Sequence, residues 1–156
     1  MKSSEKQKLA NEAAERFLNG YNCAQSVLMT MCEHWNVENE LIPKIASGFG
    51  GGIGRCGSVC GVLTGAVMAL GIKFGSNAAP AEKRRQVYSV SGKLVKQFEK
   101  RHGTVYCRDL IGYDLYDPKE WERAKQEEVV EKTCVHFARE AVEALLDLTE
   151  GSGCRG

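Results

Sequence analysis

Cysteine is the residue type of this sequence best suited to chemistry, because its thiolate binds metals and exchanges electrons through disulfides. The chain has 7 cysteines in 156 residues. One cysteine alone is most simply a small buried hydrophobe. Three of the four best candidates are expected near helix starts, which favours a shared redox or metal site. These four are far apart in the chain, so only the tertiary fold can bring them together: Cys23, Cys60, Cys107 and Cys134.

Helix starts matter because their unpaired N–H groups and the helix dipole favour a thiolate over a thiol. Cys23 follows Asn22, which is expected to cap a helix. Cys60 is expected in the first turn of a helix capped by Ser58, and Cys107 near the start of a short helix. These positions make the three thiols candidates for ionisation near neutral pH.

Cys134, the fourth of the best candidates, is expected well inside a long helix. The other three cysteines are weaker candidates. Cys32 is expected in the core and Cys154 in the tail, while Cys56, four residues before Cys60, is ambiguous.

The longest uncharged run extends from Cys56 to Ile72, and in it Gly57, Gly61 and Gly65 recur at every fourth position. On a helix, this spacing makes a smooth ridge against which a neighbouring backbone packs closely. A helix that is apolar all round lies inside a soluble domain, so residues 58–74 are expected to form a buried central helix. The glycines and polar residues of the run make a membrane span a poor alternative. The G-x-G-x-x-G pattern at residues 52–57 lacks the preceding strand and following acidic residue of a dinucleotide site.

Apolar residues recur at helical spacing along most of the chain, and no alternating pattern is long enough for a strand. The sequence therefore predicts an all-α fold, a single-domain bundle of five or six helices around the buried Gly/Ala-rich central helix. The domain is expected to span residues 1–148, with a disordered tail at residues 149–156. The surrounding helices are expected at residues 4–18, 22–35, 40–47, 81–101, near 107 and 119–148.

The formal net charge is +1, with 21 basic and 20 acidic residues mixed along the chain. This balance indicates no nucleic-acid partner, no anionic membrane surface and no membrane insertion. The N-terminus lacks the apolar core of a signal peptide, so a cytoplasmic protein is expected. In a reducing cytosol, redox chemistry or metal ligation is a better expectation for the cysteines than a static disulfide framework.

Four blocks of the sequence resemble a known family in their order and spacing. The chain is similar to the redox-active proteins called the C_GCAxxG_C_C family over roughly residues 5–147. One departure is Val62, where the family usually has alanine, and this small apolar exchange leaves the neighbouring cysteine and glycines in place. The blocks are GYNCAQSV from Gly20, GFGGGIG from Gly48, CGVLTGAVMALG from Cys60 and CRDLIG from Cys107, with Cys134 as the last cysteine.

The resemblance implies that the functional residues are Cys23, Cys60, Cys107 and Cys134, and it supplies no substrate. Thiol–disulfide redox chemistry on these catalytic cysteines is the first hypothesis. It needs an accessible thiolate and a second cysteine within disulfide reach. The chain lacks Cys-x-x-Cys, which counts against a thioredoxin-like exchanger. The redox partner is unknown and is either a protein or a small-molecule thiol.

The second hypothesis is an electron carrier that holds an iron–sulfur cluster, with the same four cysteines as metal ligands. The resemblance extends to a similar domain of some larger electron-transfer proteins, which favours such a cluster. Thiol chemistry is slightly preferred, because nothing local in the spacing demands a metal.

A structural zinc site ranks third, since only Cys56 and Cys60 approach the local spacing of zinc ligands. If the four sulfurs lie apart, the chain is better interpreted as a non-enzymatic helical binding module. The sequence leaves the oligomeric state open, with a homo-oligomer as one option.

Overall fold

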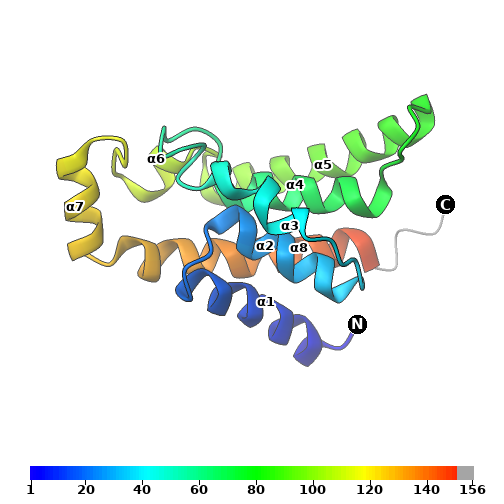
Figure 1. Ribbon diagram of the computed structural model, residues 1–156, viewed down its shortest axis with the longest axis horizontal. Helices are drawn as coiled ribbons and strands as arrows, with labels where there is room; N and C mark the ends of the chain where they lie inside the picture. The colour runs from blue at the N-terminus through cyan, green and yellow to red at the C-terminus, as the bar shows by residue number, and fades with distance from the viewer. Residues whose placement is uncertain (151–156) are drawn as a thin grey trace.

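The computed structural model describes residues 1–150 and shows an all-α single domain over them (Figure 1). The all-α prediction is confirmed, and the β-type pairing found within these residues is one isolated bridge between Val59 and Tyr106. Eight α-helices lie in this part of the chain, where the sequence predicts five or six. They are α1 (Ser3–Leu18), α2 (Cys23–His34), α3 (Leu41–Ile45), α4 (Gly61–Phe74), α5 (Ala81–His102), α6 (Cys107–Ile111), α7 (Pro118–Gln126) and α8 (Val135–Glu150), with a 3-10 turn at Ser47–Phe49 and a π-helical turn at Val130–Cys134.

The predicted helix at residues 119–148 is wrong as one element, because the chain divides it into α7, the π-helical turn and α8. Asp117 starts α7 as predicted, and its carboxylate accepts the N–H groups of Lys119 at 2.9 Å and Glu120 at 3.0 Å. The break follows at Glu128, whose φ is +52°. A left-handed residue cannot continue a right-handed helix, and this division accounts for part of the higher helix count.

Most of the hydrophobic core lies where α1, α2, α4 and α8 pack together, with α5 against α4. Three of these helices, α2, α4 and α8, all contact one another and all contribute fully buried side chains. The structure therefore shows a shared core, and it does not single out the glycine-rich helix as the centre. The largest fully buried side chains are Leu28, Met31, Leu63, Leu70, Leu94 and Leu145.

A second, smaller core lies at the end of the molecule that carries α6 and α7 (Figure 1). Its buried residues are Cys107, Leu115 and Ala124, and Trp121 packs against them. Cys60, by contrast, belongs to the main core. Two of the candidate cysteines are thus buried in different parts of the molecule's interior.

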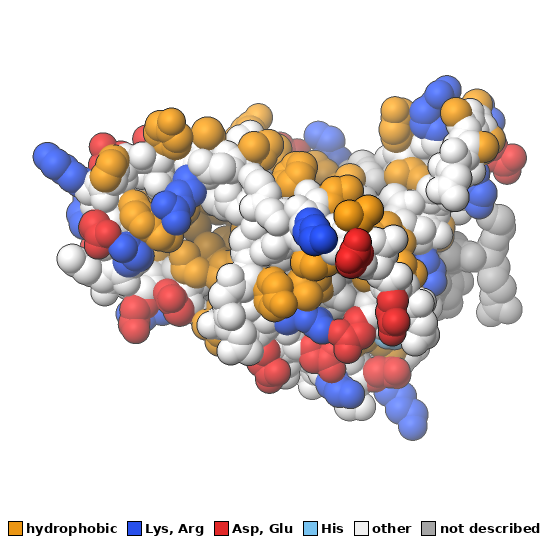
Figure 2. Space-filling model, viewed as in Figure 1, with side chains coloured by type: hydrophobic (Ala, Val, Ile, Leu, Met, Phe, Trp, Pro, Cys, Tyr) orange, Lys and Arg blue, Asp and Glu red, His pale blue; other side chains and the backbone are white. Residues whose placement is uncertain are grey.

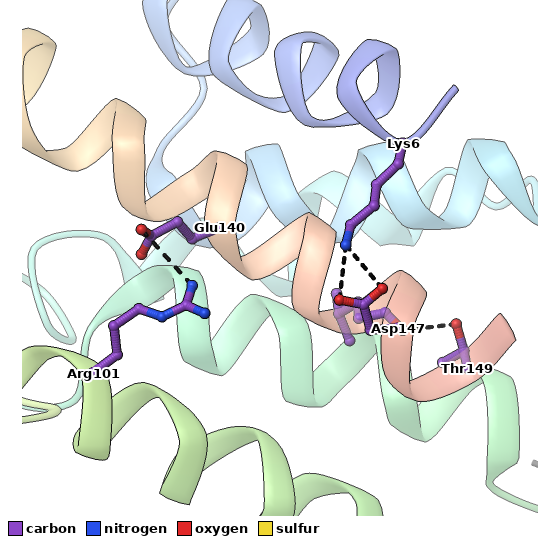
Figure 3. A network of polar contacts seen from close by, with 6 residues as sticks. Lys6, Arg101, Glu140, Asp147 and Thr149 are labelled. Carbon is purple, nitrogen blue, oxygen red and sulfur yellow. Dashed lines mark hydrogen bonds and ion pairs between the residues drawn. The ribbon is translucent and has the colours of Figure 1, made fainter. Parts of the chain in front are cut away.

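Charged side chains of α1 and α5 form ion pairs with α8 (Figure 3). Lys6 of α1 lies 2.7 Å from Asp147, and Arg101 of α5 lies 3.9 Å from Glu140. His102 also contacts Glu140, at 2.7 Å. Because these pairs remain partly exposed, each contributes at most about 1 kcal/mol. The apolar contacts of α8 therefore carry most of its attachment.

Lysine, arginine and acidic side chains are interspersed over the visible face of the molecule (Figure 2). No helix within residues 1–150 combines the length and the apolar character needed to cross a membrane. The helix α8 ends at Glu150, so the first two residues of the predicted tail are helical. The rest of that tail, including Cys154, lies outside the described residues.

Candidate functional site

A glycine-rich loop before α4 has a left-handed backbone over five consecutive residues. Glycine adopts this conformation readily, whereas the conformation is strained for Ile53 and Arg55, which carry side chains. Backbone N–H groups further along the chain close the loop by donating to the carbonyls of Gly51 at 3.1 Å and Gly52 at 3.0 Å. The φ angles are +64° at Gly51, +69° at Gly52, +63° at Ile53, +58° at Gly54 and +67° at Arg55.

This glycine loop packs directly against Cys107. A Cβ atom at Gly52 would lie 2.7 Å from Cys107 Cβ and 2.6 Å from Ser58 O, so no side chain fits there. The Cys107 N–H donates to Ser58 O at 2.7 Å, and the Cys60 N–H donates to Val105 O at 2.8 Å. These hydrogen bonds pair the segment before α4 with the segment before α6. The starts of α4 and α6 therefore lie side by side.

Cys23 is the first residue of α2, as predicted, and the start of this helix is firmly capped. Asn22 Oδ1 accepts from Gln25 N–H at 2.9 Å, and Gln25 Oε1 accepts from Asn22 N–H at 3.1 Å. These two bonds form the complete capping box. Asn22 Nδ2 also donates to Ser47 O at 3.0 Å, which ties α2 to the segment that leads into the glycine loop.

Close packing between α2 and α4 brings Cys23 to the start of α4. A Cβ atom at Gly61 would lie 2.1 Å from Cys23 Sγ, and one at Gly65 would lie 2.4 Å from Ala24 O. The predicted close approach along a glycine ridge is therefore confirmed at these two positions. Gly57, which the prediction places at the head of the ridge, lies in the preceding loop with φ +70°.

Cys60 directly precedes the first turn of α4, because this helix begins at Gly61 rather than at Ser58. The predicted cap by Ser58 is wrong, since the Ser58 carbonyl pairs with Cys107 and the local backbone is bridged rather than helical. Cys60 is buried, with 7% of its surface exposed. Its thiol is therefore shielded from direct contact with bulk solvent.

The other two candidate cysteines lie on short elements. Cys107 begins α6, as predicted, but α6 has only 5 residues, and Cys107 is buried. Cys134 ends the π-helical turn and is partly exposed. Single π turns are rare and are frequent at functional sites. The position of Cys134 therefore depends on an irregular turn and not on the regular helix that the sequence predicts.

Cys23 differs from the other candidates in the number of backbone N–H groups around its sulfur. Burial raises the pKa of Cys23 above 9.0, while backbone N–H groups of Gly51, Ala24, Cys23 itself and Gly61 oppose that rise. The donors belong to the glycine loop, the start of α2 and the start of α4. N–H groups from three separate segments thus reduce, without reversing, the rise that burial causes in the pKa of this partly exposed residue.

The charge of Cys23 acts on each of the other three thiols. Burial raises the pKa of Cys60 well above 9.0, and Cys23, Cys107 and Cys134 raise it further. Burial and then Cys23 raise the pKa of Cys107 to about 11. Burial, followed by Cys23, Cys107 and Glu131, raises the pKa of Cys134 to about 12. The four thiols therefore interact electrostatically, although they come from different segments.

Within residues 1–150, no group of three or more His, Cys, Asp or Glu side chains is placed to hold a metal ion. Structural zinc requires four ligands at about 2.0–2.3 Å from one ion. The thiols as they are arranged do not fit such a site, so the structural-zinc alternative has no support in the geometry.

A groove of about 690 Å³ lies between α5 and α8, and its lining includes Leu94, Phe98 and Ala141. None of the cysteines is among the residues that line it. This hollow is therefore separate from the candidate cysteines. A molecule that reacts with the thiols would have to approach the partly exposed Cys23 or Cys134 from the surface.

The remaining cysteines differ in their surroundings. Cys32 lies in the main core, as predicted, and burial raises its pKa to about 11. Cys56 is exposed, with its thiol 4.0 Å from Gly54 O. Neither cysteine acts on the pKa of the four interacting thiols.

The sequence did not identify Gly51 and Gly61 as parts of the site. Both lie in stretches that it singles out, one in a turn and one on a packing ridge. Their role depends on which side chain lies opposite, and that is a long-range property. The position of Gly61 directly after Cys60 was the available signal for a close approach, but it did not identify Cys23 as the neighbour.

Comparison with known proteins supports a single family for nearly the whole chain. Residues 21–148 match the family described as "Putative redox-active protein (C_GCAxxG_C_C)". An uncharacterised protein of Archaeoglobus fulgidus is 31% identical over 97 residues, which cover 57% of this chain and 64% of that relative, just under two thirds of its length. No solved structure matches the chain. Because the family match extends over most of the sequence, the chain belongs to the C_GCAxxG_C_C family.

Proposed function

We propose that this chain is a redox protein that exchanges electrons by thiol–disulfide chemistry among four cysteines. The observation that carries the proposal is the packing that brings Cys23 Sγ to Gly61, the residue after Cys60, and that pairs the segment around Cys60 with the segment that leads into Cys107. The effects of these thiols on the pKa values of Cys60, Cys107 and Cys134 support the same grouping. The redox activity named in the family description supports the same class of function. The cysteines are Cys23, Cys60, Cys107 and Cys134.

The raised pKa values favour the role of electron donor. A dithiol whose reduced form is stabilised as a thiolate acts as an oxidant, because oxidation removes that stabilisation. The thiols of this chain are in the opposite situation, because burial raises the pKa of Cys23 and Cys60 above 9.0, that of Cys107 to about 11 and that of Cys134 to about 12. They are therefore expected to pass electrons to the disulfide of a partner protein or of a small molecule.

Thiol counting tests the proposal. Full-length protein purified without oxygen is expected to be colourless and to lose two free thiols on mild oxidation, which a reductant restores. Serine variants of the four cysteines, taken one at a time, identify the pair that oxidises. Cys56→Ser is the matched control, because this exposed cysteine takes no part in the interactions among the four. This variant should have one free thiol fewer in the reduced protein, and it should still lose two free thiols on mild oxidation.

An iron–sulfur electron carrier on the same cysteines is the second candidate. Four cysteine thiols are the ligand set that such a cluster requires, but their arrangement within residues 1–150 does not fit a metal ion, so the cysteines would have to move to hold it. The protein purified without oxygen would then contain iron and acid-labile sulfide, and Cys60→Ser would abolish its visible absorption. This result would favour the electron carrier over the dithiol. Colourless protein whose thiols all resist oxidation would contradict both candidates and leave a helical binding module.

A further inference from the structure

We infer, on the basis of the proposed function, that Cys23 is the attacking thiol of the site and Cys60 its resolving partner, with a disulfide as substrate. This assignment adds an order of events to the four-cysteine chemistry. It also gives the glycine loop and the start of α4 a direct role at the reacting sulfur.

Backbone N–H groups approach Cys23 Sγ from three segments. The start of α2 contributes Cys23 and Ala24, the glycine loop contributes Gly51, and the start of α4 contributes Gly61. Such groups lower the free-energy cost of negative charge on the sulfur, and the positive dipole ends of two helices lie at the same place. The buried member of the pair, Cys60, has this kind of support from one residue, Val62.

Cys60 is the resolving partner that the geometry favours. It directly precedes Gly61, where a Cβ atom would lie 2.1 Å from Cys23 Sγ. Among the thiols that affect Cys60, Cys23 has the largest effect. Exposure sets the order, because Cys23 is partly exposed whereas only 7% of Cys60 is. A substrate therefore reaches Cys23 first.

The reaction proceeds by two exchange steps. The Cys23 thiolate attacks one sulfur of the substrate R–S–S–R′, the Cys23–S–S–R bond forms, the substrate S–S bond breaks, and R′–S⁻ leaves. The Cys60 thiolate then attacks the Cys23 sulfur, the Cys23–Cys60 disulfide forms, and R–S⁻ leaves. The protons of the two cysteines end on the two released thiols. Two electrons have then passed from the protein to the substrate.

A trapping experiment tests the assignment. The full-length protein, with Cys56→Ser and Cys154→Ser to remove two thiols outside the group of four, reacts without oxygen with the aryl disulfide dithiobis-nitrobenzoate, whose released thiolate absorbs visible light. We expect a fast phase that releases two aryl thiolates per chain and leaves a Cys23–Cys60 disulfide. In a protein that also carries Cys60→Ser, the fast phase should release one aryl thiolate per chain. Peptide mass mapping should then find the remaining aryl group on Cys23. Cys23→Ser should abolish the fast phase.

Two glycine variants test the N–H groups without removing a cysteine. Gly61→Ala places a methyl group against Cys23 Sγ, whereas Gly71→Ala on the same helix meets no atom within 4 Å. The fast phase is expected to slow about tenfold in Gly61→Ala and to change less than about twofold in Gly71→Ala. Circular dichroism checks that both remain helical. If Gly61→Ala does not fold, the trapping result alone decides.

The outcomes separate this assignment from the proposed function. A disulfide between another pair in the oxidised protein overturns the assignment and leaves the dithiol function in place. So does an aryl group trapped on Cys107 or Cys134 in the Cys60→Ser variant. A chain that forms no internal disulfide with any oxidant overturns the function itself.

Discussion

The four candidate cysteines divide into two pairs that the fold holds in different ways. Cys23 and Cys60 lie where two long helices meet, α2 with 12 residues and α4 with 14. Cys107 and Cys134 lie on a 5-residue helix and in a 5-residue π turn. The first pair is positioned by a complete capping box and by glycines packed against backbone. The second pair depends on short elements, one of which is buried in the smaller core.

This difference suggests that the first pair forms the disulfide and that the second pair affects it through charge. A pair that forms a disulfide needs its two sulfurs held within a narrow range of geometry, and long, well-packed helices provide that. Short elements with few buried contacts open more readily. They can still influence the pair through charge, because that influence requires less exact placement. The same kind of substitution should therefore cost more stability in the main core than in the smaller one.

A matched pair of leucine truncations tests this comparison with the largest expected effect. Leu63 of α4 is fully buried in the main core, and Leu115 is 6% exposed in the smaller one. Leu63→Ala is expected to lower the free energy of unfolding by about 4 kcal/mol and Leu115→Ala by about 2 kcal/mol. Urea unfolding measures both. Equal costs, or a larger cost at Leu115, would remove the distinction between the two cores.

Overpacking the contact between α2 and α4 should be the next largest effect. Gly65→Leu places a side chain where Cβ alone would lie 2.4 Å from the carbonyl oxygen of Ala24, which cannot move without α2. The expected loss of stability is about 3 kcal/mol. Gly71→Leu is the control, since Cβ there meets no atom within 4 Å. A Gly65→Leu protein that melts like the wild type would show that the close contact is unimportant.

Alkaline pH should weaken the fold through the buried thiols. The folded pKa is raised to about 11 at Cys107 and to about 12 at Cys134, from an ordinary value of 9.0. Between these values the unfolded chain binds fewer protons than the folded one. These groups therefore stabilise the fold fully below about pH 9, and their contribution is lost as the pH rises towards 12.

Urea unfolding at about pH 8 and about pH 10 checks this expectation. The wild type should lose stability between the two conditions, and a variant that carries Cys107→Ala should lose less. An unchanged pH dependence in that variant would show that the Cys107 thiol does not ionise as its burial requires.

The smallest expected effect concerns Glu131 in the π turn. Its carboxylate is the last of the causes that raise the pKa of Cys134, after burial, Cys23 and Cys107. Glu131→Gln should lower that pKa slightly, and Cys23→Ser should lower it more. The pH dependence of Cys134 alkylation, followed by peptide mass spectrometry, measures both shifts. If Glu131→Gln has the larger effect, the local carboxylate governs Cys134 more than the other thiols do.

Signals that act within a few residues predicted much of the fold. The apolar stripe at residues 4–18 predicts α1, observed at Ser3–Leu18, and Asn22 caps α2 as expected. The predicted single helix at residues 119–148 fails because Glu128 adopts a left-handed conformation that neither glycine nor proline announces. The sequence shows helix-forming residues on both sides of that point, so local propensity could not place the break.

The candidate site was only partly predictable for a similar reason. The start of α2 at Cys23 follows from a local cap, and the close approach at Gly61 follows from the glycine spacing. The hydrogen bonds that join Cys60 to Val105 and Cys107 to Ser58 connect segments far apart in the chain. Nothing local marks these partners. The sequence therefore proposes four candidate cysteines, but it could not show which segments lie beside each of them.

The left-handed turn at residues 51–55 has the handedness of a helix made from D-amino acids. A D-residue adopts positive φ as readily as an L-residue adopts negative φ, because their steric maps are mirror images. At Gly54, φ is +58° and an L-residue Cβ would meet no atom within 4 Å, so the cost of L-alanine comes from the backbone alone. A chemically synthesised chain with D-alanine at this position should be more stable than its L-alanine epimer by about 1–2 kcal/mol. Mirror-image chemistry would thus suit this short stretch better than natural chirality does.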